Sequence, residues 1–312
     1  MRGKISPPDL VPAVKLYSMD RSAGQRITAA RLASFWALTK PRQTGLLLFT
    51  GACAYTLSHG FPLEPLEGLA ITAGLLPSIS GCTALNMLLD RDIDSKMTRT
   101  ANRPLPRGSI HPVEALLFGG LLSAGGLGLS LTLDRAFGAV VVAGFIIDLL
   151  IYTAWLKRRT PLSIVFGGVS GGMPLLAGRV LAVGRVDYIG ILLASSVLLW
   201  IPSHILTLTS RYAADYERAG VPTWPGAYGQ RATRLTIAGA NLLNTLVLMT
   251  AGILLHIDRL ALLSLLVMSL SIVALSARQF VRPTQQRNWL LFKTSSLYML
   301  ASSFVITLGK LL

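Results

Sequence analysis

The sequence predicts an all-α protein whose helices cross a lipid bilayer. Of its 312 residues, 52% are hydrophobic and only 14% are charged, whereas a soluble domain has roughly a quarter charged residues. The hydrophobic residues gather in windows of about twenty, the length of helix that crosses the hydrocarbon core. Basic residues also concentrate in every second connection between these windows, which is typical of membrane proteins with several spans.

Nine windows are long and apolar enough to be transmembrane helices, and together they form one predicted transmembrane domain over 43–312. The seventh and eighth windows are separated only by a tight turn at 256–258. In chain order the windows lie at 43–59, 66–89, 113–132, 136–156, 162–183, 188–209, 233–255, 259–277 and 289–310.

The segment 1–42 precedes the first window and contains prolines, charges of both signs and no long apolar run. It therefore does not resemble a secretory signal peptide. Asp9 and Asp20 also argue against a transit peptide, since such peptides contain few acidic residues. We expect a cytoplasmic tail that leads into an interfacial helix near 32–38.

The basic residues predict the orientation of the chain in the membrane. Most of the 29 Lys and Arg residues lie in the tail or in the connections after even-numbered windows. The positive-inside rule places these connections and the N-terminus in the cytoplasm of a cell-membrane protein, with the C-terminus outside. The net charge of +15 is explained in this way. No alternating basic and aromatic pattern suggests nucleic-acid binding.

The densest cluster of carboxylates directly follows the second window. Asn86, Asp90 and Asp94 recur every four residues, so on a helix they project from one face, about a turn apart. Mg²⁺ prefers such oxygen ligands and commonly shares them with phosphate oxygens. The basic residues from Arg91 to Arg107 include guanidinium groups that suit phosphate. A solvated loop is the alternative, but the position at the end of a membrane helix favours a metal–diphosphate site.

A second acidic stretch, 211–222, follows the sixth window. Because four spans separate Asp90 from Asp215, we expect both stretches on the same side of the membrane. Two acidic loops over one cavity could hold two Mg²⁺ ions on a diphosphate group, where they would stabilise the departing oxygen. Taken alone, the second stretch is also compatible with an ordinary loop.

Two polar residues lie inside predicted spans. His204 precedes Asp215 by 11 residues, or about 16 Å along a helix, which is deeper than the carboxylates. It is either a hydrogen-bonded packing residue or a ligand for a substrate. Asp148 lies within the fourth window, where a carboxylate is costly and usually has a partner or a function. We leave it outside the predicted catalytic set.

Four stretches resemble the UbiA superfamily of intramembrane prenyltransferases, and within it most closely the protohaem IX farnesyltransferases, or haem O synthases. They are "LTKPR" at 38–42, "RDIDSKMTRTANRPLPRG" at 91–108, "LKRRTPLSIVFGG" at 156–168 and "WIPSHILTL…DYERAGVP" at 200–222. The resemblance implies nine helices around a central cavity and a Mg²⁺-dependent transfer of a prenyl group.

The resemblance also implies roles for particular residues. The catalytic metal–diphosphate site would use Asn86, Asp90, Asp94 and Asp215, with Glu217 as a further metal ligand. The diphosphate would contact Arg99, Asn102, Arg103, Lys157 and Arg158. Trp200 and His204 would contact the haem, with His204 as a candidate iron ligand.

The implied reaction ionises farnesyl diphosphate, joins the allylic cation to a vinyl group of haem B and completes a hydroxyethylfarnesyl group with water. Aromatic faces could stabilise the cation, and the candidates are Tyr152, Trp155 and Trp200. A haem A synthase or an oxidase assembly protein is a possible partner. The alternatives are a related prenyltransferase that acts on a quinone-precursor ring, a chlorin or a glycerol ether lipid, or a transporter.

Three features depart from the family pattern. Ser203 stands where the family usually has a second proline. The run at 223–229 replaces a methionine–leucine–proline–valine sequence. Arg211 occupies the first acidic position of the superfamily's second motif, so Asp215 and Glu217 are the oxygen ligands left for a second metal.

Overall fold

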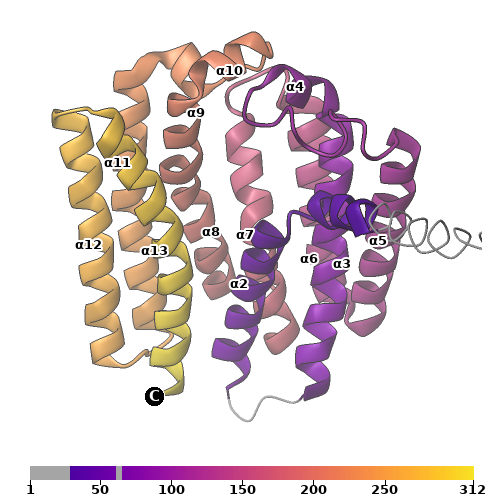
Figure 1. Ribbon diagram of the computed structural model, residues 1–312. Coiled ribbons are helices and arrows are strands. Elements are labelled where there is room, and N and C mark those ends of the chain that lie inside the picture. Colours follow the sequence, from indigo (N-terminus) through magenta and orange to yellow (C-terminus); the bar gives the residue numbers. More distant parts are fainter. Residues whose placement is uncertain (1–28, 61–64) are drawn as a thin grey trace, which may run out of the picture.

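The computed structural model describes residues 29–60 and 65–312, and this part of the chain is helical with no β-strand (Figure 1). The predicted tail at 1–28 lies outside the described residues. Residues 29–38 form the short helix expected before the first span, and it lies across the bundle. Phe35 packs against Phe118 with ring centroids 5.1 Å apart, while the Trp36 side chain is largely exposed.

The nine predicted spans correspond to nine long helical segments among the described residues, two of which are continuous runs of several elements. Eight of them are long and apolar enough to cross a membrane, whereas α2 is less apolar because Pro41, Arg42 and Gln43 begin it. The segments are α2 (Pro41–His59), α3 (Pro65–Leu89), α5 (Pro112–Leu133), α6 with η1 (Arg135–Phe145 and Ile146–Leu156), α7 (Ser163–Val183), α8 with η2 and α9 (Tyr188–Ile201, Pro202–Leu206 and Thr207–Arg211), α11 (Trp224–Leu254), α12 (Arg259–Val281) and α13 (Gln285–Leu311).

The long helices form a closed ring. Each long helix packs against the next one in the chain, and α13 returns to pack against α2. Helix α2 also packs against α7 across the interior. Two short helices, α4 (Arg91–Lys96) and α10 (Ala213–Arg218), lie together at the end of the bundle opposite the C-terminus (Figure 1).

Glycines allow α2 and α7 to approach closely. A Cβ atom added to Gly178 of α7 would lie 2.0 Å from the carbonyl oxygen of Gly51 on α2. A Cβ atom on Gly51 would in turn lie 2.9 Å from the carbonyl oxygen of Pro174. Both distances are shorter than side-chain packing permits, so this helix pair depends on the absence of side chains at its crossing.

Two segments of the bundle are wound as π-helices. In η1, the backbone N–H of Lys157 donates to the carbonyl of Tyr152, five residues earlier, at 2.8 Å. The segment η2 begins at Pro202, whose missing N–H removes one bond of a regular helix. Insertions of this kind often occur at functional sites, and these two contain Asp148 and His204.

Candidate active site

The two acidic loops meet at one end of the bundle, as the sequence predicts. Ile93 of α4 and Met97, which directly follows it, pack against Ala219 and Val221 beyond α10. The loop after α4 is also tied to α10, since the backbone N–H of Arg99 donates to Asp215 Oδ2 at 3.2 Å.

Asn86, Asp90 and Asp94 are stacked on one helical face across the junction of α3 and α4. The backbone N–H of Asp90 donates to the carbonyl of Asn86 at 2.9 Å, and that of Asp94 to the carbonyl of Asp90 at 2.8 Å. Bonds of helical spacing therefore link the three residues, as the sequence predicts, although Asp90 itself leaves helical geometry, with φ −89° and ψ 0°, between α3 and α4. All three side chains are buried within the protein. The sequence placed them only at the end of an apolar helix and did not indicate this burial.

Each buried carboxylate has a basic partner. Lys157 Nζ lies 2.5 Å from Asp90 Oδ2. Arg103 donates to both oxygens of Asp94, at 2.9 and 2.7 Å, and Arg218 pairs with Asp215. Within residues 29–60 and 65–312, no three His, Cys, Asp or Glu side chains come close enough to hold a metal ion by themselves. A metal here would need the amide of Asn86, phosphate oxygens or water as additional ligands.

Two buried oxygens in this motif fit such a metal. Asn86 Oδ1 and Asp90 Oδ1 are buried and accept no hydrogen bond from any described residue. A buried polar atom without a partner costs about 1–3 kcal/mol, so it usually marks a place where something else binds. Because the two residues are one helical turn apart, a cation such as Mg²⁺ could contact both oxygens.

Asp148 lies directly behind Asn86. Asn86 Nδ2 donates to Asp148 Oδ2 at 2.6 Å. The same carboxylate accepts from Ser170 Oγ at 3.0 Å and from Cys82 Sγ at 3.3 Å. The sequence led us to expect a partner for this intramembrane carboxylate. That partner is Asn86, which belongs to the candidate metal site.

Lys40 is a further basic group at the site, and it is not among the residues singled out by the sequence pattern. It precedes α2 in a left-handed conformation with φ 45°, which is uncommon for a residue other than glycine. Burial, followed by the charges of Arg103 and Lys157, lowers the pKa of Lys40 to about 8, while Asp90 and Asp148 act in the opposite direction. The only hint in the sequence is its place in the "LTKPR" stretch.

Several predicted site residues lie away from the buried carboxylates. Arg158 donates to both oxygens of Asp92, each at 2.7 Å, so it holds the outer side of α4. The exposed residues among the predicted set are Arg99, Asn102, Arg158 and Glu217. The guanidinium of Arg211 lies over the Trp289 ring, 4.4 Å from its centroid, where it takes no part in an acidic motif.

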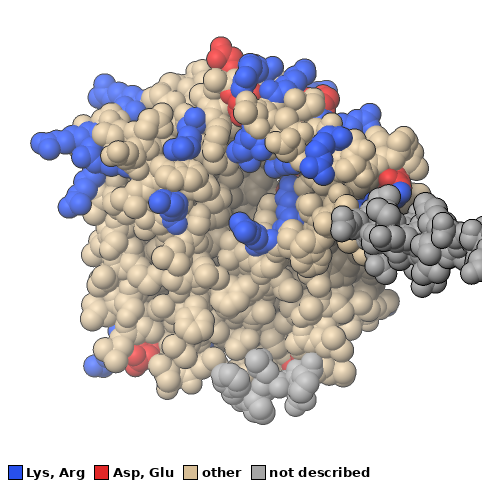
Figure 2. Space-filling model, viewed as in Figure 1, with Lys and Arg blue, Asp and Glu red and all other residues tan. Residues whose placement is uncertain are grey.

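A cavity of about 740 Å³ lies below the acidic loops, and the face of the molecule in Figure 2 is hollowed below its basic end. Its lining comes from α2, α3, α6, η1, α7, α8, η2 and α13, and includes both Asp148 and His204. A mostly apolar cavity with a few polar groups is typical of a site for a small molecule or cofactor.

His204 forms one aromatic wall of this cavity. Its ring stacks between those of Trp200 and Phe292, with centroids 4.7 and 4.6 Å away. Ser296 Oγ lies 3.1 Å from His204 Nδ1, so this bond engages one of the two ring nitrogens. Ser203, the departure from the family pattern, donates to Asn241 Oδ1 at 2.6 Å and thereby ties η2 to α11.

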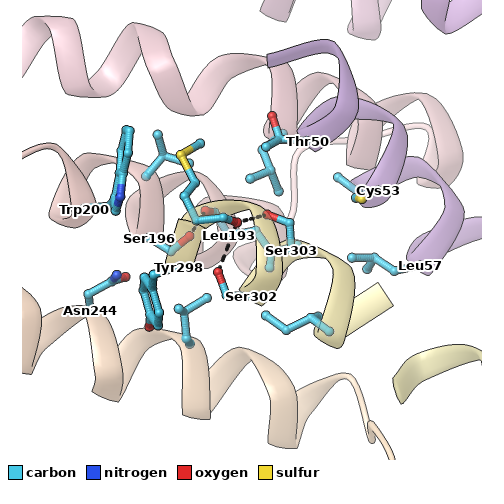
Figure 3. A pocket seen from close by; sticks show the side chains of 16 residues that line it. Thr50, Cys53, Leu57, Leu193, Ser196, Trp200, Asn244, Tyr298, Ser302 and Ser303 are labelled. Carbon is cyan, nitrogen blue, oxygen red and sulfur yellow. Dashed lines mark hydrogen bonds between the residues drawn. The ribbon is translucent and has the colours of Figure 1, made fainter. Parts of the chain in front are cut away.

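A smaller pocket of about 20 Å³ is also lined by Trp200 (Figure 3). Trp200 lines both spaces, and its Nε1–H donates to the carbonyl of Ser295 at 2.6 Å. A space of this size holds about one water molecule. Trp200 is therefore fixed as a partition, and the large cavity is the only one of the two that could take a substrate.

Comparison with known proteins identifies the family. Residues 46–302 match the UbiA prenyltransferase family. The chain belongs to this family. It is 46% identical over 213 residues to a protohaem IX farnesyltransferase of Korarchaeum cryptofilum, and the aligned region covers 68% of this chain and 72% of the relative. It is 38% identical over 259 residues to the protohaem IX farnesyltransferase of Symbiobacterium thermophilum, with 81% and 85% covered.

Solved structures show that the fold is also that of the UbiA prenyltransferase family. A digeranylgeranylglyceryl phosphate synthase superposes with a TM-score of 0.76 at 20% identity, covering 90% of this chain and 99% of that one. A UbiA homologue of Archaeoglobus fulgidus bound to GPP and Mg²⁺ gives a TM-score of 0.65 at 14% identity, with 88% and 99% covered. At these identities the likeness concerns the fold alone.

Proposed function

We propose that this prenyltransferase transfers the farnesyl group of farnesyl diphosphate to a vinyl group of haem B, forming haem O and releasing diphosphate. The proposal rests chiefly on its similarity to protohaem IX farnesyltransferases over most of the chain. The site is compatible with it, because the cavity extends from Asp148, which contacts Asn86 of the acidic motif, to an aromatic wall at His204 suited to a porphyrin.

The polar end would bind the diphosphate. Asn86, Asp90, Asp94 and Asp215 would hold Mg²⁺, which when bound would neutralise the leaving group and stabilise its departing oxygen. Lys40, Lys157 and Arg103 would bind the phosphate oxygens directly. The last two already pair with carboxylates of the motif, so they stand beside the place where the phosphate oxygens would bind.

The apolar part of the cavity would hold the farnesyl chain and the haem. The bond between C1 of the farnesyl group and the diphosphate oxygen breaks, and the vinyl group forms a new carbon–carbon bond at C1. The resulting cation next to the porphyrin ring takes up water and loses a proton, which completes the hydroxyethyl group. The buried lining keeps bulk water from the allylic cation before the vinyl group reaches it. His204 would contact the haem plane or its iron.

The decisive experiment separates the two substrates with two variants. His204→Ala removes an imidazole from the cavity but no charge from the diphosphate end, so haem binding or transfer should fall at least tenfold while farnesyl diphosphate still binds with Mg²⁺. Asp94→Ala should do the reverse. Both ligands are titrated against both variants in nanodiscs, and turnover is followed with labelled farnesyl diphosphate. Unchanged haem affinity and transfer in His204→Ala would show that His204 does not contact the haem, whereas native protein that transfers no farnesyl group to haem B would overturn the proposed acceptor.

A further inference from the structure

We propose that Asp148 is a positioning residue that orients the amide of Asn86, so that the oxygen of this amide, and not its nitrogen, faces the metal–diphosphate site. This inference rests on the proposed function, since it assumes that the motif of Asn86 and Asp90 binds a divalent cation.

The two ends of an asparagine amide have nearly the same shape but opposite chemistry. The oxygen can ligate Mg²⁺, whereas the NH₂ group is a donor and cannot. Only hydrogen-bond partners decide which end faces a site. An ionised carboxylate accepts and does not donate, so Asp148 can engage Asn86 only through Nδ2, as it does at 2.6 Å. This contact leaves Asn86 Oδ1 buried and without a partner among the described residues.

Asp90 follows Asn86 by four residues, about one helical turn, and its Oδ1 is also buried and unpartnered within the described chain. Lys157 binds only the other oxygen of Asp90, and Asp148 binds only the nitrogen of Asn86. Each contact therefore leaves one oxygen of the bound side chain for a ligand. Such outer contacts generally fix the orientation of metal ligands.

Asp148 is itself held in place from two helices. Ser170 of α7 donates to Oδ1 at 3.0 Å and Cys82 of α3 donates to Oδ2 at 3.3 Å. Hydrogen bonds to a carboxylate are stronger than neutral ones, so they reduce the cost of a charge at this depth. Both oxygens of Asp148 therefore already have donors within the protein. These contacts favour a positioning role.

The test is an exchange of the two side chains. Asp148→Ala removes the acceptor, so the amide of Asn86 can rotate and the affinity for Mn²⁺, a paramagnetic substitute for Mg²⁺, should fall about 10-fold or more. In Asn86→Asp/Asp148→Asn, the new amide can donate to the new carboxylate and again leave one oxygen facing the site. This double variant should recover Mn²⁺ affinity to within a few-fold of the native protein, whereas Asn86→Asp alone places two carboxylates in contact.

Mn²⁺ binding is measured by electron paramagnetic resonance on full-length protein in nanodiscs, with a non-hydrolysable farnesyl diphosphate analogue present. Asp90→Asn serves as the reference. If Asp90→Asn abolishes Mn²⁺ binding but Asp148→Ala leaves it unchanged, the positioning role is wrong and the proposed function stands. If Asp90→Asn also has no effect, the metal site itself is wrong. Should Asp148→Ala not fold, a folded double variant that fails to bind Mn²⁺ refutes the proposal.

Discussion

Lys40 combines an unfavourable backbone conformation with a position at the candidate site. A left-handed conformation costs a residue with a side chain about 1–2 kcal/mol, and Lys40 adopts it directly before Pro41 at the start of α2. Conformations of this kind persist where the surrounding structure imposes them, often at functional sites. Here the result is an ammonium group close to Arg103 and Lys157, an arrangement that a diphosphate would stabilise.

The pKa of Lys40 predicts a pH dependence of substrate binding. Because this pKa is lowered to about 8, the side chain is charged below pH 8 and becomes neutral as the pH rises through that value. The KM for farnesyl diphosphate should therefore increase above pH 8. Lys40→Met should have a high KM at all pH values and lose this step, while the control Lys96→Met, at an exposed position, should keep it. A step that persists in Lys40→Met would assign the effect to another group.

At the scale of single residues, local spacing was predictable and long-range pairing was not. The repeat of Asn86, Asp90 and Asp94 needs only helical periodicity, and the structure has it. The pairing of Asp148 with Asn86 depends on how η1 packs against α3, which no local pattern encodes. Arg158 shows the same limit, because the sequence did not indicate its pairing with Asp92, while its predicted diphosphate contact stays a prediction.

At the scale of elements, hydropathy located the helices but not their polar ends or their irregular turns. Helix α11 begins at Trp224, nine residues before the predicted window. The window starts late because the first turns of the helix contain the polar residues Gln230 and Arg231, which lower the average hydropathy. It is also kinked at Gly229, where φ is 78°. The π-helical turns of η1 and η2 are invisible to an average over twenty residues, yet they set the direction of Asp148 and His204.

The crossing of α2 and α7 gives a prediction about stability. Gly178→Ala would place a methyl group 2.0 Å from a backbone oxygen of α2, and the helices must separate to accept it. We expect a loss of about 1–3 kcal/mol, the usual effect of an overfilled core, seen as a lower melting temperature in detergent. Gly125→Ala is the matched control, since nothing lies within 4 Å of the added atom. Equal melting temperatures for the two variants would show that α2 and α7 do not pack this tightly.

At the scale of the whole molecule, charge and chemistry lie at the same end. Lys and Arg side chains gather at the end of the bundle that contains α4 and α10, and few lie at the other end (Figure 2). Among the exceptions, Arg179 is neutralised by Asp187, at 2.6 Å, near the turn between α7 and α8. The basic end therefore coincides with the candidate diphosphate site. A water-soluble diphosphate could reach this site from the cytoplasm if the positive-inside rule holds.

This coincidence leads to a prediction of topology. Seven of the nine segments, from α5 to α13, separate the α4 loop from the C-terminus and put them on opposite sides. The C-terminus lies at the end away from α4 (Figure 1). A reporter fused after Leu312 should therefore be external. Asn102→Cys, at an exposed position, should react with an impermeant maleimide only from the cytoplasmic side, while the native Cys53 and Cys82 are buried and should stay unlabelled. If both readouts are reversed, the seven spans between them stand and the orientation is wrong. If only the Leu312 reporter is reversed, one of the seven segments between the α4 loop and the C-terminus does not cross the membrane.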